Sequence, residues 1–281
     1  MNEHQPHVRL HDGERVPAFG QGTWHMGESP RLAAEEAASL RLGIELGFEL
    51  IDTAEMYGSG RAEEIVGEAI KGQRHRLFIV SKVLPQNASL RGTIEACERS
   101  LKRLKTDRID LYLLHWRGSH PLADTLAAFE RLQRDGKIRH HGVSNFDTDD
   151  LLQWTALTGG AAAAANQILY NLSTRGPEWE LIPWCRKRHI AIMAYTPLGQ
   201  GRLLGNRVLG EVAARHGATP AQVALAWLLR QDGMMVIPKA SKPEHVRDNF
   251  GALKLKLTED DVAALDRGFP PPKGPAALGM L

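Results

Sequence analysis

Cysteine is scarce in this sequence, and its scarcity excludes one class of protein. The chain of 281 residues contains only Cys97 and Cys185. Two cysteines cannot provide the several disulfides that hold small secreted domains together. Both lie inside segments with helical periodicity, and we expect both to be free thiols in a reducing cytoplasm. We expect no bound metal ion.

Long apolar runs and blocks of like charge are also absent. No segment approaches the roughly 18 consecutive apolar residues that cross a bilayer, and the first ten residues, MNEHQPHVRL, are too polar for a signal peptide. The formal net charge is only +2, and the lysines and arginines are interspersed with aspartates and glutamates. This pattern is not typical of nucleic-acid binding. The composition therefore predicts a soluble cytoplasmic protein with no membrane or nucleic-acid partner.

What the sequence does contain is a regular alternation of short apolar segments with longer segments of helical periodicity. Apolar residues make up 43% of the chain, enough for a substantial core. The predicted strands are Ala18–Trp24, Phe48–Thr53, Leu77–Lys82, Asp110–His115, His141–Asn145, Ala165–Tyr170, Ile190–Leu198 and Met234–Lys239. Eight strands alternating with helices favour an α/β fold, the closed parallel (β/α)8 TIM barrel, with a doubly wound open sheet as the alternative.

The two ends of the chain differ from this pattern. Near the N-terminus, VRLHDGERVPA predicts a β-hairpin that turns at Asp12-Gly13 and lies at the bottom of the barrel. At the C-terminus, PPPKGPAALGML predicts an extended tail. Between them we find no linker, low-complexity stretch or internal repeat, so residues 1–281 are expected to form a single domain.

Three consecutive predicted strands end in an ionisable residue: Asp52, Lys82 and His115. A polar group in such apolar surroundings costs about 2–7 kcal/mol unless a partner meets it. The carboxyl ends of barrel strands converge on one rim, where barrel enzymes carry their active sites. One polar strand end is commonplace, whereas three in neighbouring strands indicate a shared site. Tyr57, in the loop after the second strand, is expected to lie over the same point.

The combination of these four residue types suggests proton transfer. A tyrosine has a pKa of about 10 and is a poor acid at neutral pH. A neighbouring ammonium favours the phenolate and lowers that pKa. We therefore expect Lys82 to activate Tyr57 while Asp52 keeps Lys82 charged. His115 is expected to hydrogen-bond the substrate oxygen, and the group as a whole is suited to protonating a developing alkoxide.

Several motifs, in this order and spacing, resemble the aldo-keto reductase family. They are IDTAEMYGSG, SK, LLHW, GVSNF, NQ, YTPLGQG and IPKAS, and together they span nearly the whole chain. The resemblance implies an NAD(P)H-dependent oxidoreductase that reduces aldehydes and ketones to alcohols. It implies Tyr57 as the proton donor, with Asp52, Lys82 and His115 completing the catalytic set. GQGTWHMGE and DTAEMY are most similar to bacterial members that reduce methylglyoxal and other small aldehydes.

The sequence contains no Rossmann motif for a dinucleotide cofactor, because no G-x-G-x-x-G follows a predicted strand and begins a helix. GQGRLLG, residues 199–205, follows the seventh strand, where barrel loops often build a phosphate site. The resemblance implies that Tyr195 stacks on the nicotinamide ring. It implies further cofactor contacts at Gly22, Thr23, Trp24, Asp52, Ser144, Asn145, Gln167, Thr196, Leu198, Gln200, Asp248 and Asn249.

The segment IPKASKPEHVRDNF, after the eighth strand, is expected to contact a ribose 2′-phosphate. Lys239 and Lys242 supply positive charge. Ser241 and Glu244 have the spacing of a capping box at a helix N-terminus, which attracts phosphate. These features favour NADPH. His245 stands where the family usually has arginine, and it lacks the permanent charge and the fork of donors, so NADH is the alternative cofactor.

The substrate is expected to be a small carbonyl compound. The resemblance implies that Trp24, Met56 and Trp116 line an apolar pocket beside Tyr57 and His115.

Two neighbouring segments are expected at the same rim. They are His25 with Met26 and the tail after Phe269, which would form a third wall. Because this tail is short, we expect an open pocket that accepts a range of small aldehydes.

Two other functions are compatible with the residues. A barrel aldolase would use Lys82 as a Schiff-base nucleophile, although Asp52 beside it favours a protonated lysine. A non-catalytic nicotinamide-binding regulatory subunit would use the same fold, although no large insertion offers an interaction surface. The resemblance implies a monomeric enzyme acting on a small molecule.

Overall fold

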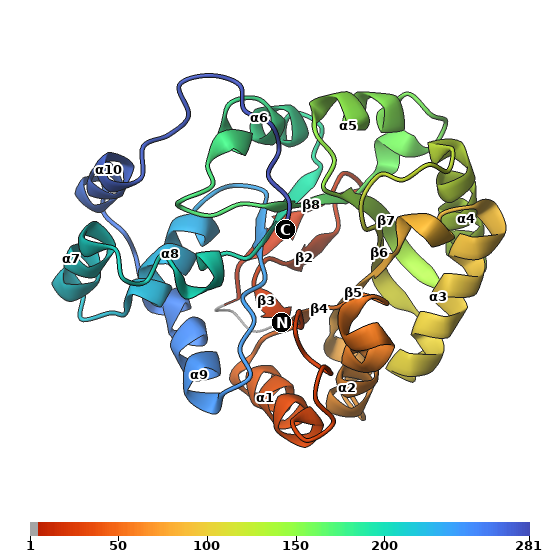
Figure 1. The fold of residues 1–281 in the computed structure, drawn as a ribbon, viewed down its shortest axis with the longest axis horizontal. Coiled ribbons are helices and arrows are strands. Elements are labelled where there is room, and N and C mark those ends of the chain that lie inside the picture. Colours follow the sequence, from red (N-terminus) through yellow and green to blue (C-terminus); the bar gives the residue numbers. More distant parts are fainter. Residues whose placement is uncertain (1–4) are drawn as a thin grey trace.

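The computed structural model describes residues 5–281 and shows a parallel β-barrel inside a ring of helices (Figure 1). The barrel strands pair in parallel in the order in which they occur in the chain. They are β3 (Gly20–Gly22), β4 (Leu50–Asp52), β5 (Phe78–Val83), β6 (Ile109–Leu114), β7 (Ile138–Ser144), β8 (Ala165–Leu169), β9 (Ala191–Tyr195) and β10 (Met234–Val236). Bridges from Phe19 to Val236 and from Gly22 to Lys239 join the first strand to the last. The predicted TIM barrel is therefore confirmed.

All eight predicted strands are present, and the differences lie at their ends. The seventh was predicted over Ile190–Leu198, whereas β9 ends at Tyr195. The next residue, Thr196, has a φ of 51°. That left-handed conformation cannot continue an extended strand.

Helices cover the outside of the barrel. They are α1 (Ala33–Leu46), α2 (Arg61–Ala69), α3 (Leu90–Leu104), α4 (Leu122–Arg134), α5 (Thr148–Thr155), α6 (Leu181–Arg186), α7 (Arg207–Arg215), α8 (Pro220–Leu229), α9 (Pro243–Gly251) and α10 (Glu259–Gly268). Helices α1 to α8 lie between successive strands, and α9 and α10 follow the last strand. Local signals explain their ends: Gly47 ends α1 with a φ of 119°, and Thr219 starts α8 with a capping box to Gln222. None of the helices in the described residues is long and apolar enough to cross a membrane.

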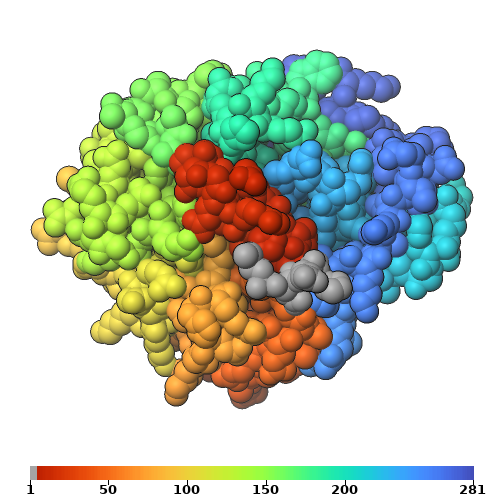
Figure 2. Space-filling view, turned by 180° about the vertical axis from the view of Figure 1, so that it is seen from behind, coloured from red at the N-terminus to blue at the C-terminus, as the bar shows by residue number. Residues whose placement is uncertain are grey.

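The predicted N-terminal hairpin is present and covers the amino-terminal end of the barrel, as the red segment in Figure 2 shows. Its strands β1 (His7–Arg9) and β2 (Arg15–Pro17) pair antiparallel around a turn that contains Gly13 at a φ of 87°. Val8 and Val16 are buried against the inner side chains of the barrel strands. The hairpin therefore seals one end of the barrel, and the site must open at the other.

The C-terminal tail runs back over that other end. After α10 the chain is extended, and the C-terminus lies over the centre of the barrel in Figure 1. The backbone N–H of Leu281 lies 3.4 Å from the hydroxyl of Tyr195. The tail therefore forms part of the wall around this open end of the barrel, which we call the mouth, as predicted from the sequence.

Candidate active site

An ion pair between Asp52 and Lys82 lies at the base of the mouth. The strands that carry them, β4 and β5, are neighbours, so their carboxyl ends bring the two side chains together. The Lys82 Nζ donates to Asp52 Oδ1 at 2.8 Å, to Asp52 Oδ2 at 2.9 Å and to the Thr53 carbonyl at 2.8 Å. Burial raises the pKa of the Asp52 carboxyl and lowers that of the Lys82 ammonium, while the attraction between the two charges opposes both shifts. The predicted pairing of these two residues is confirmed.

Tyr57 completes this chain of hydrogen bonds. It begins a 3₁₀ turn, Tyr57–Gly60, in the loop that follows β4, and Lys82 Nζ lies 3.2 Å from its hydroxyl. The turn is tight because Gly58 has a φ of 55° and a Cβ there would lie 2.7 Å from the Met26 carbonyl oxygen. Any other residue at position 58 would therefore force either this turn or the facing backbone at Met26 to shift. Met26 itself is fully buried, so the expectation that it reaches the rim was wrong.

The electrostatics of the site correct one part of the sequence prediction. Burial of the hydroxyl, followed by the negative charge of Asp52, raises the pKa of Tyr57 well above its ordinary value. The expected lowering of the Tyr57 pKa by Lys82 is not found, because burial of the hydroxyl, and after it the negative charge of Asp52, act in the opposite direction. Tyr57 is therefore a neutral phenol at neutral pH and gives its proton only to a strongly basic oxygen, such as a developing alkoxide.

His115 faces the same point from the end of β6. Its ring centroid lies 5.8 Å from that of Tyr57, edge to face. Burial, with a smaller contribution from the charge of Lys82, lowers the pKa of His115 to about 2. The imidazole is therefore neutral, with one N–H to donate and one nitrogen to accept. Its buried Nδ1 has no hydrogen-bond partner among the described residues.

A cavity of about 560 Å³ opens above these groups. It brings together most of the residues selected from the sequence. These are Gly22, Trp24, His25, Asp52, Met56, Tyr57, His115, Trp116, Ser144, Asn145, Gln167, Tyr195, Thr196, Leu198, Gln200, Lys239 and His245. Lys82 lies directly beneath the cavity and is fully buried.

Hydrogen bonds between the lining residues hold the wall of the cavity in place. The Tyr195 hydroxyl donates to Asn145 Oδ1 at 2.9 Å, and the Asn145 amide donates to the His115 carbonyl at 3.1 Å. The Gln167 amide donates to Asp52 Oδ1 at 2.8 Å. Gln167 is therefore hydrogen-bonded to the Asp52–Lys82 ion pair, a contact that its position in the sequence did not indicate.

The loop after β9 contributes a wall with an unusual backbone. Thr196, Gly199, Gln200 and Gly201 all have positive φ, and a Cβ added at Gly201 would meet nothing within 4 Å. Such conformations turn backbone N–H groups in directions that regular structure does not allow, a feature of anion-binding loops. This is the glycine-rich loop that the sequence suggested as a phosphate site.

Four of the predicted cofactor residues do not line the cavity: Thr23, Ser241, Asp248 and Asn249. Thr23 is buried and its hydroxyl donates to the Asp52 carbonyl at 3.0 Å. Asp248 accepts from the hydroxyl of Thr219 at 2.9 Å. Both side chains therefore already have partners within the protein.

The predicted capping box at Ser241 is wrong. Helix α9 begins at Pro243, so the residue before the helix is Lys242, and no side chain caps it. A proline is favoured at the first helical position, and here it moves the start of the helix beyond the reach of Ser241. The Ser241 hydroxyl instead accepts from Lys239 Nζ at 3.1 Å.

Sequence reasoning named part of the lining only by segment and missed another part. Gly201 and Leu204 lie in the glycine-rich loop and Leu281 in the tail, both selected from the sequence, whereas Pro197, Ile237 and Pro238 were not selected. Most of these are apolar or small residues, and nothing in their type or spacing distinguishes them from core or loop positions.

Together the fold and the site define a barrel enzyme with a hydrogen-bonded Asp–Lys–Tyr group and a neutral histidine at the base of one large cavity. Residues 18–268 match the model of the aldo/keto reductase family. The chain is 50% identical to methylglyoxal reductase YeaE of Escherichia coli over 95% of each protein. It is 37% identical to glyoxal reductase of Bacillus subtilis, covering 92% of this chain and 91% of that protein.

A solved structure supports the same family assignment. An aldo-keto reductase from Klebsiella pneumoniae in complex with NADPH is 46% identical, with a TM-score of 0.96 over 99% of both chains. The chain belongs to the aldo/keto reductase family. It is an NADP-dependent oxidoreductase that reduces carbonyl groups.

Proposed function

We propose that this enzyme uses NADPH to reduce small aldehydes and ketones, methylglyoxal among them, with Tyr57 as the proton donor. The observation that carries the proposal is the hydrogen-bonded chain from Asp52 through Lys82 to Tyr57 at the base of the cavity. The names of the relatives in Escherichia coli and Bacillus subtilis support the substrate class. Steady-state assays with a panel of aldehydes and both reduced nicotinamides test it; activity with neither nicotinamide would contradict it.

The residues present suit a bound dinucleotide. The cavity is lined both by the catalytic groups and by Lys239 and His245, which lie beyond β10. Tyr195 offers a ring at the mouth, and the loop after β9 offers the positive-φ backbone of Thr196 and Gln200 for a pyrophosphate. When bound, the cofactor supplies a hydride to the carbonyl carbon.

The protein's own groups handle the proton. The Tyr57 hydroxyl donates its proton to the carbonyl oxygen as negative charge develops there, and Lys82 stabilises the phenolate that remains. Asp52 keeps Lys82 charged and oriented. The neutral ring of His115 supplies a hydrogen bond that orients the substrate oxygen, and solvent then returns a proton to Tyr57.

The aldolase alternative is disfavoured by the surroundings of Lys82. A Schiff-base lysine must be a neutral amine with a free lone pair. Here Nζ is fully buried and donates to Asp52 and Thr53, with Tyr57 3.2 Å away. Borohydride in the presence of a carbonyl substrate should therefore leave Lys82 unmodified, as judged by intact mass; a stable adduct would favour the aldolase. Regulatory binding without catalysis is disfavoured by the complete hydrogen-bonded set.

We propose three further properties: that residues 1–281 form one domain, that the enzyme is monomeric and that it works in the cytoplasm. Cys97 and Cys185 are buried and unpaired, and burial raises the pKa of each thiol to about 12. Such inert free thiols suit a reducing compartment. Light scattering coupled to size exclusion tests the monomer, and a dimer mass would contradict it.

His115 is expected to stay neutral across the physiological pH range, because burial and Lys82 hold its pKa near 2. Because the histidine pKa is lowered, the ring gains a proton only at a pH far below 6.5, the ordinary pKa of histidine. NMR of the histidine side chains, with the His115 signal assigned by its absence from His115→Gln, should show no titration of that signal between about pH 5 and 8. A midpoint inside that range would contradict the assignment.

Lys239 is expected to contact the 2′-phosphate of NADPH. A charge-assisted hydrogen bond contributes about 1.5–3 kcal/mol, so Lys239→Ala should raise the Kd for NADPH by about one to two powers of ten. The Kd for NADH should barely change. Fluorescence titration measures both, with the exposed Lys256→Ala as the control.

His245→Arg, which adds a permanent charge at the cavity edge, should tighten NADPH binding in the same titration. Equal weakening of both cofactors by Lys239→Ala would place the lysine elsewhere on the cofactor.

A further inference from the structure

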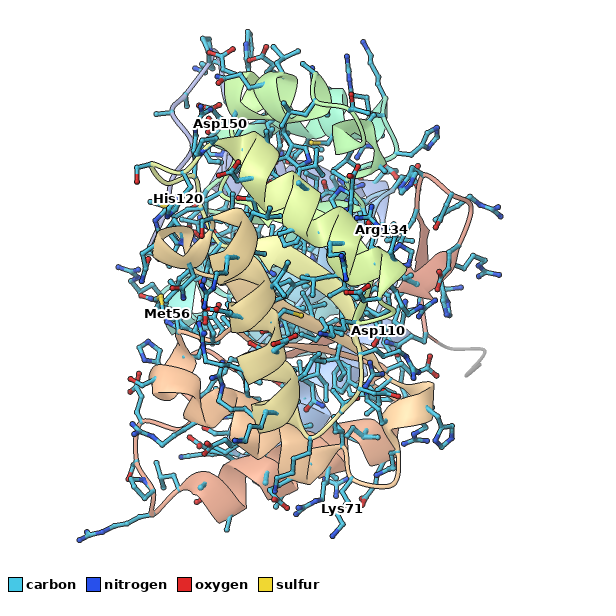
Figure 3. All side chains as sticks on the ribbon, turned by 90° about the vertical axis from the view of Figure 1, so that its right-hand side faces the viewer. Met56, Lys71, Asp110, His120, Arg134 and Asp150 are labelled. Carbon is cyan, nitrogen blue, oxygen red and sulfur yellow. The ribbon has the colours of Figure 1, made fainter. Side chains whose placement is uncertain are left out.

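The sealed end of the barrel carries a second cluster of ionisable side chains. Asp12 and Glu14 come from the hairpin turn and His140 from β7. One ligand atom from each of the three lies within 4.8 Å of the others. This is the end of the molecule at which Figure 3 labels Asp110, opposite Met56 at the catalytic mouth. The cluster is therefore separate from the active site.

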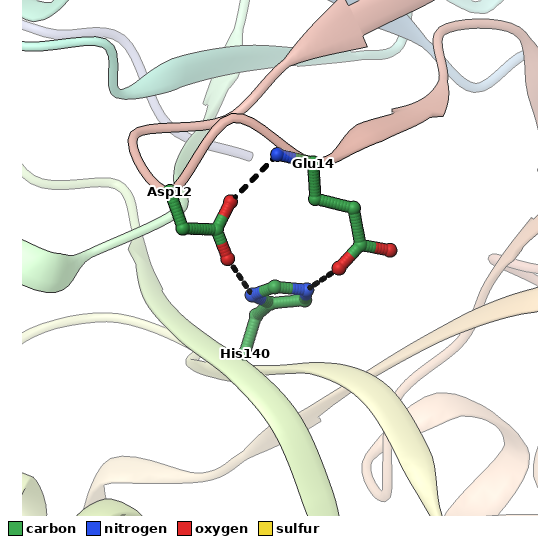
Figure 4. Close-up of side chains that lie close together, drawn as sticks. All are labelled: Asp12, Glu14 and His140. Atoms are coloured by element: carbon green, nitrogen blue, oxygen red, sulfur yellow. Dashed lines mark hydrogen bonds and ion pairs between the residues drawn. The ribbon is translucent and has the colours of Figure 1, made fainter.

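The imidazole of His140 lies between the two carboxylates (Figure 4). Its Nε2 hydrogen-bonds Glu14 Oε2 at 3.0 Å. Its Nδ1 faces Asp12 Oδ2 at 3.8 Å, too far for a hydrogen bond. The His140 side chain is only 8% exposed, and Nδ1 has no hydrogen bond to any described residue. One nitrogen of a nearly buried ring therefore faces a carboxylate at ion-pair distance, without a hydrogen bond between them.

The spacing fits a metal ion between Nδ1 and Oδ2. When Nε2 donates its proton to Glu14, Nδ1 of the neutral ring carries a lone pair. Two ligand atoms bound tetrahedrally to one zinc ion at about 2.0–2.2 Å lie roughly 3.3–3.5 Å apart. The observed distance of 3.8 Å between Nδ1 and Oδ2 is closer to this value than to the length of a hydrogen bond. Metal-binding histidines usually donate their other N–H to a carboxylate, as His140 does to Glu14.

The neighbouring arginines pair with carboxylates other than Asp12, so Asp12 is available to bind an ion. Glu14 pairs with Arg139, and Arg139 also pairs with Asp110 at 3.1 Å. Asp110 is paired in turn with Arg74 at 2.7 Å. Asp12 has no arginine or lysine partner within the part of the chain that the structure describes; its Oδ1 accepts from the Glu14 backbone N–H at 2.9 Å.

We propose that Asp12 Oδ2 and His140 Nδ1 bind a divalent ion of the zinc type, with Glu14 orienting the histidine and water completing the coordination. Imidazole with carboxylate suits such ions. The ion links the hairpin to β7 and so stabilises the sealed end of the barrel, since it binds the folded state. The proposal departs from the expectation of no bound metal ion, and no sequence motif indicates the site because Asp12 and His140 are far apart in the sequence.

Calorimetric titration of the full-length protein with Zn²⁺ in metal-free buffer at neutral pH tests the proposal. The wild type should bind one ion, and Asp12→Asn should bind it at least about tenfold more weakly. The asparagine keeps an Oδ1 acceptor for the Glu14 N–H, so the turn is preserved. Asp107→Asn, at an exposed aspartate outside the cluster, is the matched control and should bind as the wild type does.

A second readout separates a built site from adventitious binding. Zn²⁺ should raise the thermal unfolding midpoint of the wild type and of Asp107→Asn, but not of Asp12→Asn, and carbonyl reduction should be equal in all three without the ion. Other imidazole–carboxylate pairs, such as His25 with Glu28, remain intact in every variant. Equal Zn²⁺ affinity in wild type and Asp12→Asn, or no binding to the wild type, would overturn the proposal.

Discussion

Tyr57→Phe is expected to lower kcat for carbonyl reduction by about 10²- to 10⁴-fold, the usual contribution of a positioned general acid. The phenyl ring keeps the packing against His115, and only the hydroxyl beside Lys82 is lost. The Kd for NADPH should therefore change little. Stopped-flow reduction at saturating substrate, together with fluorescence titration of the cofactor, measures the two quantities separately.

Tyr112→Phe is the matched control for this experiment. Tyr112 is fully buried in β6, and its hydroxyl has no hydrogen-bond partner among the described residues. Removing that hydroxyl should leave kcat near the wild-type value. A kcat for Tyr57→Phe close to that of Tyr112→Phe would remove Tyr57 from the role of proton donor.

Lys82→Met is expected to be the most damaging substitution at the site, because it acts on both catalysis and stability. It removes the charge that stabilises the phenolate of Tyr57, and it leaves Asp52 buried without its partner. Breaking one side of a buried ion pair costs about 3–5 kcal/mol of folding free energy. The loss of kcat should be at least as large as in Asp52→Asn, and the two losses should be strongly non-additive in the double variant, since the pair acts as one unit.

Chemical denaturation and single-turnover rates distinguish the two effects. Arg103→Met is the control, since it leaves another buried carboxylate, Glu63, without its ion-pair partner at 2.6 Å, away from the cavity. That variant should lose stability while its folded fraction retains kcat. Additive rate losses for Lys82→Met and Asp52→Asn would show that the two residues work independently.

The sequence predicted the lining of the substrate pocket only in part. Trp24, Met56 and Trp116 line the cavity as expected. Leu204 and Leu281 also do so, and they come from a loop and from the end of the tail. A side chain that joins a cavity through a loop has no periodic pattern, so its position depends on how the loop folds over the barrel.

The sequence by itself determined the barrel and the four residues, Asp52, Tyr57, Lys82 and His115, that meet at the base of its cavity. Alternating apolar and helical segments define the strands, and the carboxyl ends of parallel strands must meet at one rim, so Asp52, Lys82 and His115 were certain to converge once the strands were recognised. Local signals were equally sufficient for the hairpin turn at Gly13 and for the start of α8 at Thr219.

Only the tertiary structure decided how these groups influence one another. The pKa of Tyr57 depends on burial and on the distance to both members of an ion pair, and neither quantity is encoded locally, so the expected direction of the shift was wrong. The meeting of Asp12 with His140 likewise depends on the hairpin folding under the barrel. Long-range contacts of this kind arise from packing, because charge interactions depend on separation and burial in space rather than on separation along the chain.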